Sequence, residues 1–170
     1  MKVSGATFCR NIIELDYPIV EAITSILPIV DEFVVNVGDS RDGTLELIKS
    51  INSPKIVIIK SKWDDSLRKD GLIFSQQAQI AINHCTGDWV FYLNADEVVH
   101  ENDLPKIYEY MERYLKNEEV LGVMFRYLHF DGDYWSVNPW RYRKEIRIIR
   151  NNGKVRAYGD MIGLCVLIVV

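Results

Sequence analysis

The sequence predicts an α/β fold in which helices flank a mixed, mainly parallel sheet. Short runs rich in Val, Ile and Phe alternate with helical patterns over the first two thirds of the chain, which favours βαβ units. The run at 55–60 has a continuous apolar centre, which is typical of a strand buried on both faces. Near the C-terminus, an Asn-Gly pair between two apolar runs indicates an antiparallel hairpin.

The elements follow one another in a regular order. Strands are expected where short apolar runs are bounded by turn-forming residues, at 3–9, 33–37, 55–60 and 89–93. Apolar residues at helical spacing predict helices at 19–27, 44–51, 72–84 and 102–115. A further strand is expected at 121–128, and strands at 145–150 and 154–158 are expected to pair across Asn151-Asn152-Gly153.

Length and composition indicate one domain over residues 1–170. The chain is 48% hydrophobic and 26% charged, so it can bury a core. Its 20 basic and 24 acidic residues leave a net charge of −4, which argues against a nucleic-acid partner, because such proteins neutralise phosphates. Cys9, Cys85 and Cys165 lie far apart without a Cys-x-x-Cys pair, so we expect neither disulfides nor a cysteine zinc site.

The ends of the chain favour a cytoplasmic protein. The first residues contain no apolar stretch of about 7–15 residues such as a secretory signal needs. Residues 161–170 are apolar, but they are too few to cross a bilayer, which takes about 20 residues. They are expected to form a buried final strand or to mark a chain cut before its natural end.

Polar residues follow the predicted parallel strands, at the sheet edge where open α/β folds bind ligands. These segments are Cys9-Arg10-Asn11, Gly38-Asp39-Ser40, Ser61–Asp65 and Asn94-Ala95-Asp96-Glu97. No glycine-rich dinucleotide or P-loop motif accompanies them. Asp96 follows a buried strand, so its carboxylate could hold a hard cation such as Mg²⁺ or Mn²⁺ against a diphosphate. The alternative is that Asp96 and Glu97 open a turn.

Three stretches together resemble the family 2 glycosyltransferases of the GT-A fold: 9–11, 33–44 and 81–97, in matching order and spacing over about residues 3–105. The resemblance implies inverting transfer of a sugar from a nucleotide-diphospho-sugar to a hydroxyl of a saccharide or lipid-linked acceptor. Residues 1–105 would bind the donor, and 106–170 would form part of the acceptor side.

The resemblance also implies roles for individual residues. Asn94-Ala95-Asp96 falls at the family's Asp-x-Asp motif, so Asp96 would bind Mn²⁺ or Mg²⁺ and the diphosphate, with Asn94 near the ribose or metal. Cys9, Arg10, Asn11 and Asp39 would line the nucleoside site. The chain departs from the pattern twice: Asn94 replaces the first acid, and Val37 stands where many relatives have Asp.

Other motifs have a structural and a functional interpretation. We expect Asp42-Gly43-Thr44 to build the turn into a helix. Arg68 and Lys69 could meet the diphosphate or belong to a solvated loop. His84, His100 and His129 show no metal-ligand spacing.

An inverting transfer needs a general base for the acceptor proton. The resemblance implies an acid in the rear half, for which Asp160 is the first candidate, followed by Asp133 and Asp131.

The rear half also gathers aromatic and basic side chains. Tyr134, Trp135, Trp140 and Tyr142 could stack on sugar rings or contact lipid, or they could pack as core under the loop. Arg141, Arg143, Lys144, Arg147 and Arg150 could attract a phosphorylated or membrane-borne acceptor, with peripheral contact at the inner face of the membrane, or form a solvated strand face.

Two other functions remain open. A nucleotidyltransferase would use similar carboxylate–metal chemistry, but it usually has a glycine-rich and basic loop after the first strand, and 9–14 does not provide one. A non-catalytic nucleotide-sugar-binding module would account for Asn94 and for the abrupt C-terminus.

Overall fold

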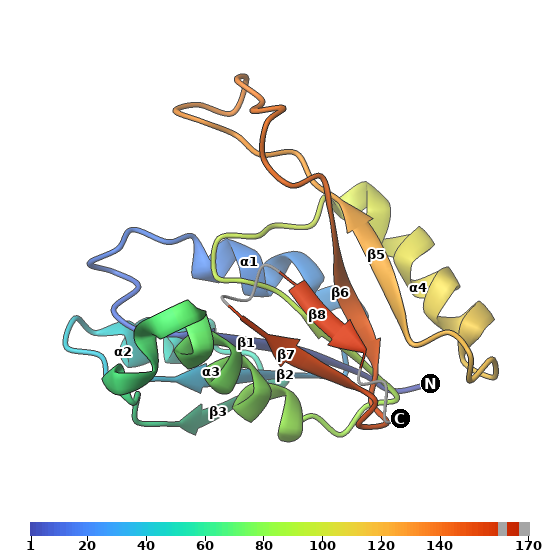
Figure 1. Cartoon of the computed structure of the whole chain (residues 1–170), viewed down its shortest axis with the longest axis horizontal. Helices are drawn as coiled ribbons and strands as arrows, with labels where there is room; N and C mark the ends of the chain where they lie inside the picture. The colour runs from blue at the N-terminus through green and yellow to red at the C-terminus, as the bar shows by residue number, and fades with distance from the viewer. Residues whose placement is uncertain (160–162, 167–170) are drawn as a thin grey trace.

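The computed structural model describes residues 1–159 and 163–166. Six strands form one sheet in the order β3-β2-β1-β4-β6-β5 (Figure 1). The first four strands are parallel: β1 (Val3–Cys9), β2 (Glu32–Val37), β3 (Ile56–Lys60) and β4 (Trp89–Tyr92). β6 (Lys144–Arg150) runs antiparallel to both β4 and β5 (Gly122–Arg126). The mixed, mainly parallel α/β sheet is therefore confirmed.

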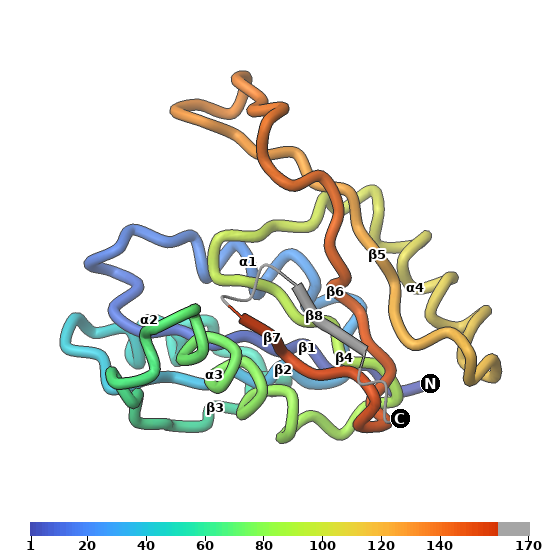
Figure 2. Tube along the Cα trace, viewed as in Figure 1, coloured from blue at the N-terminus to red at the C-terminus, as the bar shows by residue number. Residues whose placement is uncertain are grey.

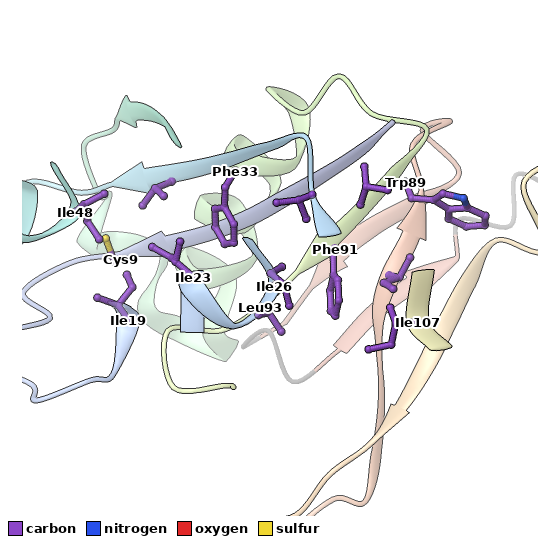
Figure 3. Close-up of a cluster of buried hydrophobic side chains, with 14 of the residues drawn as sticks. Cys9, Ile19, Ile23, Ile26, Phe33, Ile48, Trp89, Phe91, Leu93 and Ile107 are labelled. Carbon is purple, nitrogen blue, oxygen red and sulfur yellow. The ribbon is translucent and has the colours of Figure 1, made fainter. Parts of the chain in front are cut away.

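Helices cover both faces of the sheet. On one face, α1 (Ile19–Ile26), α2 (Thr44–Ser50) and α4 (Leu104–Tyr114) contribute to the larger apolar cluster, part of which Figure 3 shows. On the other, α3 (Leu72–Asn83) packs its Ala78, Ala81 and Ile82 side chains into a second cluster. The short 3₁₀ turns are η1 (Leu27–Ile29), η2 (Asp65–Gly71) and η3 (Glu101–Asp103).

The central strands are apolar on both sides because both sides are covered. In β2, Phe33 and Val35 face the larger cluster and Val34 faces α3, as the alternation of side chains along a strand requires. β3 differs from the prediction of burial on both faces. It lies at the sheet edge with a single neighbouring strand, and its Val57 is 42% exposed.

The predicted hairpin between 145–150 and 154–158 is wrong. β6 already has β4 on one edge and β5 on the other, so neither edge is free to pair with β7 (Val155–Tyr158). β7 pairs instead with β8 (Gly163–Val166), antiparallel, in a separate two-stranded sheet. The Asn151 amide donates to the carbonyls of Cys85 and Gly87, both at 3.0 Å, which anchors the turn to the body. The antiparallel hairpin of the rear half is thus formed by β5 and β6.

Residues 127–143, hereafter the arm, connect β5 to β6 and project from the body (orange in Figures 1 and 2). Phe130 and Val137 form an antiparallel bridge across it. The side chains of Tyr134, Trp135 and Trp140 are 86%, 92% and 92% exposed, so the interpretation of these residues as core is wrong. No helix in the described part of the chain is long and apolar enough to cross a membrane.

Candidate functional site

The strand order places the candidate site between β1 and β4. The chain runs from β1 outward to β2 and β3, then returns to lay β4 on the opposite side of β1. Ligands of open α/β sheets bind at the carboxyl ends of the strands beside such a reversal. The Leu93 N–H donates to the Ala6 carbonyl at 3.0 Å, so the turn after β4 begins alongside β1.

A cavity of about 370 Å³ opens at the carboxyl ends of β2 and β3 and the start of α2. Asp39 lies on its wall with a side chain that is 45% exposed, beside Ser40 and Ser61. Glu46 and Lys60 add one charge of each sign. The cavity is therefore open, has both polar and apolar walls, and lies at the sheet edge where the resemblance predicts the nucleoside.

Arg10 joins the ends of three strands. Its Nε lies 3.2 Å from Asp39 Oδ1, and its Nη1 lies 3.2 Å from Asp65 Oδ1. Its guanidinium lies 5.3 Å from the centroid of the Trp63 ring. The structure thus brings Arg10 and Asp39 together, as predicted. Trp63 lies in the segment Ser61–Asp65 that the sequence places at this edge, but no role was predicted for its side chain.

Of the two cations predicted in the polar loop, Arg68 forms an ion pair and Lys69 is exposed to solvent. Arg68 Nη2 pairs with Asp65 at 2.9 Å, while Lys69 is exposed. The hydrogen bond from Arg68, followed by that from Arg10, lowers the pKa of Asp65. Arg68 is therefore bound to Asp65 at the protein surface, and a role for Lys69 at the diphosphate stays a prediction.

Asn11 and Cys9 contribute to the site through backbone geometry. Asn11 adopts a left-handed φ of 52° and accepts the Arg41 N–H at 3.0 Å, while its own N–H donates to Ser40 Oγ at 3.0 Å. Asn11 thereby holds the loop that carries Asp39. The Cys9 thiol is 2% exposed and points into the core (Figure 3), and burial raises its pKa to about 12. The Cys9 thiol is therefore not oriented towards the sheet edge where a donor would bind, and a role for Cys9 at the donor stays a prediction.

The structural interpretation of Asp42-Gly43-Thr44 is confirmed. Asp42 Oδ1 accepts the Thr44 N–H at 3.1 Å and the Thr44 hydroxyl at 2.6 Å, and Oδ2 accepts the Glu14 N–H at 2.9 Å. Desolvation opposes ionisation, but these bonds prevail and lower the pKa of Asp42. Gly43 provides the φ of 82° from which α2 begins.

A buried ion pair organises the turn after β4. The Glu97 carboxylate is 9% exposed and Arg147 is 1% exposed, and they make two bonds, Nε to Oε2 at 2.7 Å and Nη2 to Oε1 at 2.6 Å. Glu97 also accepts the Asn94 N–H at 3.0 Å and the Asn94 amide at 3.2 Å. The Tyr92 hydroxyl donates to Asn94 Oδ1 at 2.8 Å. Asn94 is thus held by three hydrogen bonds to two residues, Tyr92 and Glu97.

Asp96 projects from this turn into solvent. Desolvation by the protein on its inner side, followed by the negative charge of Glu97, raises the pKa of Asp96. Asp96 is not among the residues that line the 370 Å³ cavity, and Ala95 packs partly against the core. The turn that the sequence offers as the alternative is present, since the Glu97 N–H donates to the Asn94 carbonyl at 3.2 Å, and a metal at Asp96 stays a prediction.

The side chains around Asp96 that could ligate a metal fit only a site in which the substrate and water supply most of the ligands. Among the described residues, no three His, Cys, Asp or Glu side chains gather as ligands. Glu97 is committed to Arg147, which leaves Asp96 as the carboxylate available on this turn. Mg²⁺ often binds through one or two carboxylates together with substrate phosphates and water. The residues therefore fit a cation that arrives largely coordinated by a diphosphate.

The candidate general bases lie in or beyond the arm. Asp133 accepts the N–H groups of Trp135 and Ser136 at 2.8 and 2.7 Å, and these bonds lower its pKa. Asp131 accepts the Asn138 amide at 2.6 Å and lies 3.6 Å from Arg141. Both acids therefore help to build the arm, and their catalytic roles stay predictions. Asp160 lies outside the described residues.

Two of the five basic residues in the rear half turn inward, contrary to both interpretations offered above. Arg147 pairs with Glu97, and Arg150 donates to the carbonyls of Tyr114, Leu115, Asn117 and Val120 at 2.8–3.1 Å. Arg150 thus secures the end of α4. The signal that was missed is the position of Arg147, one charge inside a run of isoleucines.

Comparisons with known proteins bear on this site. The chain matches the model of glycosyl transferase family 2 over residues 17–168. Uncharacterized glycosyltransferases of Rickettsia prowazekii and Rickettsia typhi are each 30% identical to it over 114 residues, which are 64% of this chain and 35% of each relative. The chain therefore spans about a third of the length of these relatives.

Solved structures of S. aureus TarS share the fold. TarS 1–349 in complex with UDP superposes with a TM-score of 0.51 at 19% identity, over 67% of this chain and 33% of that chain. A second structure of TarS 1–349 gives a TM-score of 0.54 at 16% identity, over 89% and 47%. At these identities the likeness shows the fold alone.

Proposed function

Because the chain belongs to glycosyl transferase family 2, we propose that it transfers a sugar, with inversion, from a nucleotide-diphospho-sugar to an acceptor hydroxyl. The donor class is supported by TarS, a structural neighbour determined in complex with UDP and with UDP-GlcNAc. The acceptor we propose is a saccharide or a lipid-linked sugar.

One observation carries the proposal: the cavity at the carboxyl ends of β2 and β3, with Asp39 on its wall and Arg10 against Asp39 at 3.2 Å. A carboxylate and a guanidinium side by side can accept from and donate to the edges of a nucleoside. Asn11 holds the Asp39 loop through the Arg41 N–H, so donor contacts are pre-organised.

The diphosphate is proposed to bind at Asp96, at the carboxyl end of β4, which is separated from β2 by β1 alone. Mn²⁺ or Mg²⁺ bound there would offset the negative charge that accumulates on the leaving diphosphate. The pair Glu97–Arg147 fixes the turn through Asn94 and so sets the position from which Asp96 projects. Asn94 adds an amide to this end of the site without a second negative charge.

The acceptor hydroxyl attacks the anomeric carbon from the face opposite the diphosphate, and a general base takes its proton. Asp160 remains the first candidate for that base. The lowered pKa of Asp133 makes it a weaker proton acceptor, and Asp131 is engaged by Arg141. Asp160 is therefore preferred over both.

Isothermal titration with UDP, GDP and their sugar conjugates, with and without Mn²⁺, tests the proposal. We expect at least one nucleotide to bind, and more tightly with Mn²⁺. Asp39→Asn should weaken binding about 10–100-fold with or without the metal, as loss of a charge-assisted hydrogen bond does. Asp96→Asn should instead abolish the gain that Mn²⁺ provides.

Asp103→Asn is the matched control, because Asp103 is exposed and does not line the 370 Å³ cavity. It should leave binding unchanged. If no nucleotide binds under any condition, the proposal is wrong. Donor binding without transfer or donor hydrolysis, unaffected by Asp160→Ala, would instead identify a binding module.

A further inference from the structure

The arm presents large apolar side chains to solvent that none of the described elements of the fold covers. Trp135 and Trp140 are each 92% exposed, Tyr134 is 86% exposed and Leu128 is 69% exposed. Large exposed apolar patches on soluble folds mark surfaces for partners. The arm stands clear of the sheet and of all four helices (Figures 1 and 2), so the surface is reachable.

The arm itself carries two cations and two acids, but together with Arg126 and Lys144, the strand residues that flank it, it is positively charged, opposite to the rest of the chain. Residues 126–144 carry four cations, Arg126, Arg141, Arg143 and Lys144, against Asp131 and Asp133, a net charge of +2. Because the whole chain carries −4, the remainder carries −6. A negatively charged surface would therefore attract residues 126–144, at the root of the arm, and repel the rest of the chain.

The two acids within the arm do not cancel this attraction. Asp131 is bound by Asn138 at 2.6 Å and lies 3.6 Å from Arg141, while Asp133 is held by two backbone N–H groups. For Arg126 and Lys144, no ion pair with another described residue is found. The cations at the root of the arm are thus available to an external anion.

A cavity of about 510 Å³ at the base of the arm brings these cations together. Arg126, Arg141, Arg143 and Lys144 all line it, with Leu128 and Val137 on its apolar side. A hollow with four cations and an apolar wall suits a phosphate group attached to hydrocarbon. Tryptophan and tyrosine, in turn, prefer the boundary between lipid headgroups and acyl chains.

We propose that the arm binds the surface of a bilayer containing anionic phospholipids, with Trp135 and Trp140 entering the headgroup region and lipid phosphates occupying the basic cavity. A single membrane-binding feature gives weak attachment to a bilayer, whereas aromatic insertion combined with a basic patch gives stable attachment. The proposal goes beyond sugar transfer and does not depend on it.

Flotation with vesicles tests the proposal on the full chain. Wild-type protein should float with vesicles of phosphatidylcholine mixed with phosphatidylglycerol, and much less with phosphatidylcholine alone or at molar salt. Arg143→Gln/Lys144→Gln should reduce partitioning by about tenfold or more, since each cation near an anionic surface contributes about 1 kcal/mol. Lys49→Gln/Lys116→Gln removes two exposed lysines outside the arm and should have little effect.

The aromatic contribution has its own readout. Trp135→Ala/Trp140→Ala should reduce partitioning by about tenfold or more and abolish the blue shift of tryptophan fluorescence on anionic vesicles. Trp89 is buried and should not respond. Tyr108→Ala/Tyr158→Ala is the matched control away from the arm, and it should float as wild type does.

Nucleotide titration of the same variants separates the two proposals. Unchanged nucleotide affinity with lost flotation supports an arm that acts on membranes alone. Equal flotation of wild type and arm variants would overturn the inference. So would concentration-dependent dimerisation without vesicles that Trp135→Ala/Trp140→Ala abolishes, because the patch would then be an interface between copies.

Discussion

The two ends of the parallel sheet use the same residue type for opposite purposes. At the amino end, Glu32 accepts the Ser4 hydroxyl at 2.6 Å and the N–H and hydroxyl of Thr86 at 2.7 and 2.8 Å. Asp31 and Asp88 likewise accept the N–H groups of Val3 and Lys2, both at 2.7 Å. At the carboxyl end, Asp39 and Asp96 are open to solvent.

This difference shows in the pKa values. Desolvation by itself would raise the pKa of Glu32, but hydrogen bonds from Ser4, Thr86 and Lys2 lower that pKa from 4.5 to about 2. Desolvation and the charge of Glu97 raise the pKa of Asp96. Carboxylates at the amino end therefore stabilise the fold, whereas Asp96 is kept at a cost in stability, as functional groups commonly are.

The largest expected effect is at Glu97, a carboxylate of the carboxyl end that is buried and paired with Arg147. Arg147→Met leaves Glu97 buried without its cation, which should cost about 3–5 kcal/mol of the free energy of unfolding in urea denaturation. Arg113→Met, which breaks the exposed pair with Glu109, should cost less than about 1 kcal/mol. Equal costs for the two variants would refute the structural role of Glu97.

Glu32→Gln should have the next largest effect, about 2–3 kcal/mol at neutral pH. The sign follows from the lowered pKa: the contribution is full above pH 4.5 and is lost as the pH falls towards 2. Urea denaturation of wild type across this range should show the loss, and Glu32→Gln should flatten the profile. Glu118→Gln, at an exposed acid, should retain the wild-type profile.

Substituting one glycine at each end of the parallel sheet tests how rigidly the two ends are packed. A Cβ at Gly87 would lie 2.8 Å from backbone atoms of Lys2 and Ser4, so Gly87→Ala should cost about 2 kcal/mol. A Cβ at Gly38 would meet the Trp63 indole at 2.4 Å, and a side chain can move. Gly38→Ala should cost less stability but weaken nucleotide binding. Thermal unfolding and titration measure both, and the reverse ranking of stabilities would contradict the comparison.

The smallest expected effect is a stabilisation by Asp96→Asn. Because the pKa of Asp96 is raised above 3.8, its ionised form is disfavoured in the folded protein, and stability falls as the pH rises through the folded value. The variant should remove this penalty, gaining less than about 1 kcal/mol at neutral pH after solvent screening. A clear loss of stability would show that Asp96 supports the fold.

Much of the parallel half could be predicted because local patterns determine it. The strand at 3–9 and the helix starts at Thr44 and Leu72 are found as expected, since burial on both faces and a preceding positive-φ glycine leave direct traces in sequence. The pairing of β7 could not be predicted, because it depends on β6 having no free edge, a property of the whole sheet.

The candidate site also contains some contacts that could be predicted from the sequence and others that could not. Arg10 and Asp39 follow neighbouring strands, so their meeting follows from the order of the sheet. Glu97 and Arg147 are 50 residues apart and meet only because β6 lies antiparallel beside β4. The exposure of Trp135 and Trp140 also escaped prediction, because an aromatic cluster in a loop has the same composition whether it folds inward or projects.

β6 also links two features at a fixed separation. Its first residue, Lys144, lies at the root of the arm. Arg147, three positions further along, pairs with Glu97 in the turn that carries Asp96. At about 3.4 Å per residue, the strand sets a spacing of about 10 Å between them. With the arm bound to a bilayer, the length of β6 would fix the distance from the membrane surface at which an acceptor held in the lipid must present its hydroxyl.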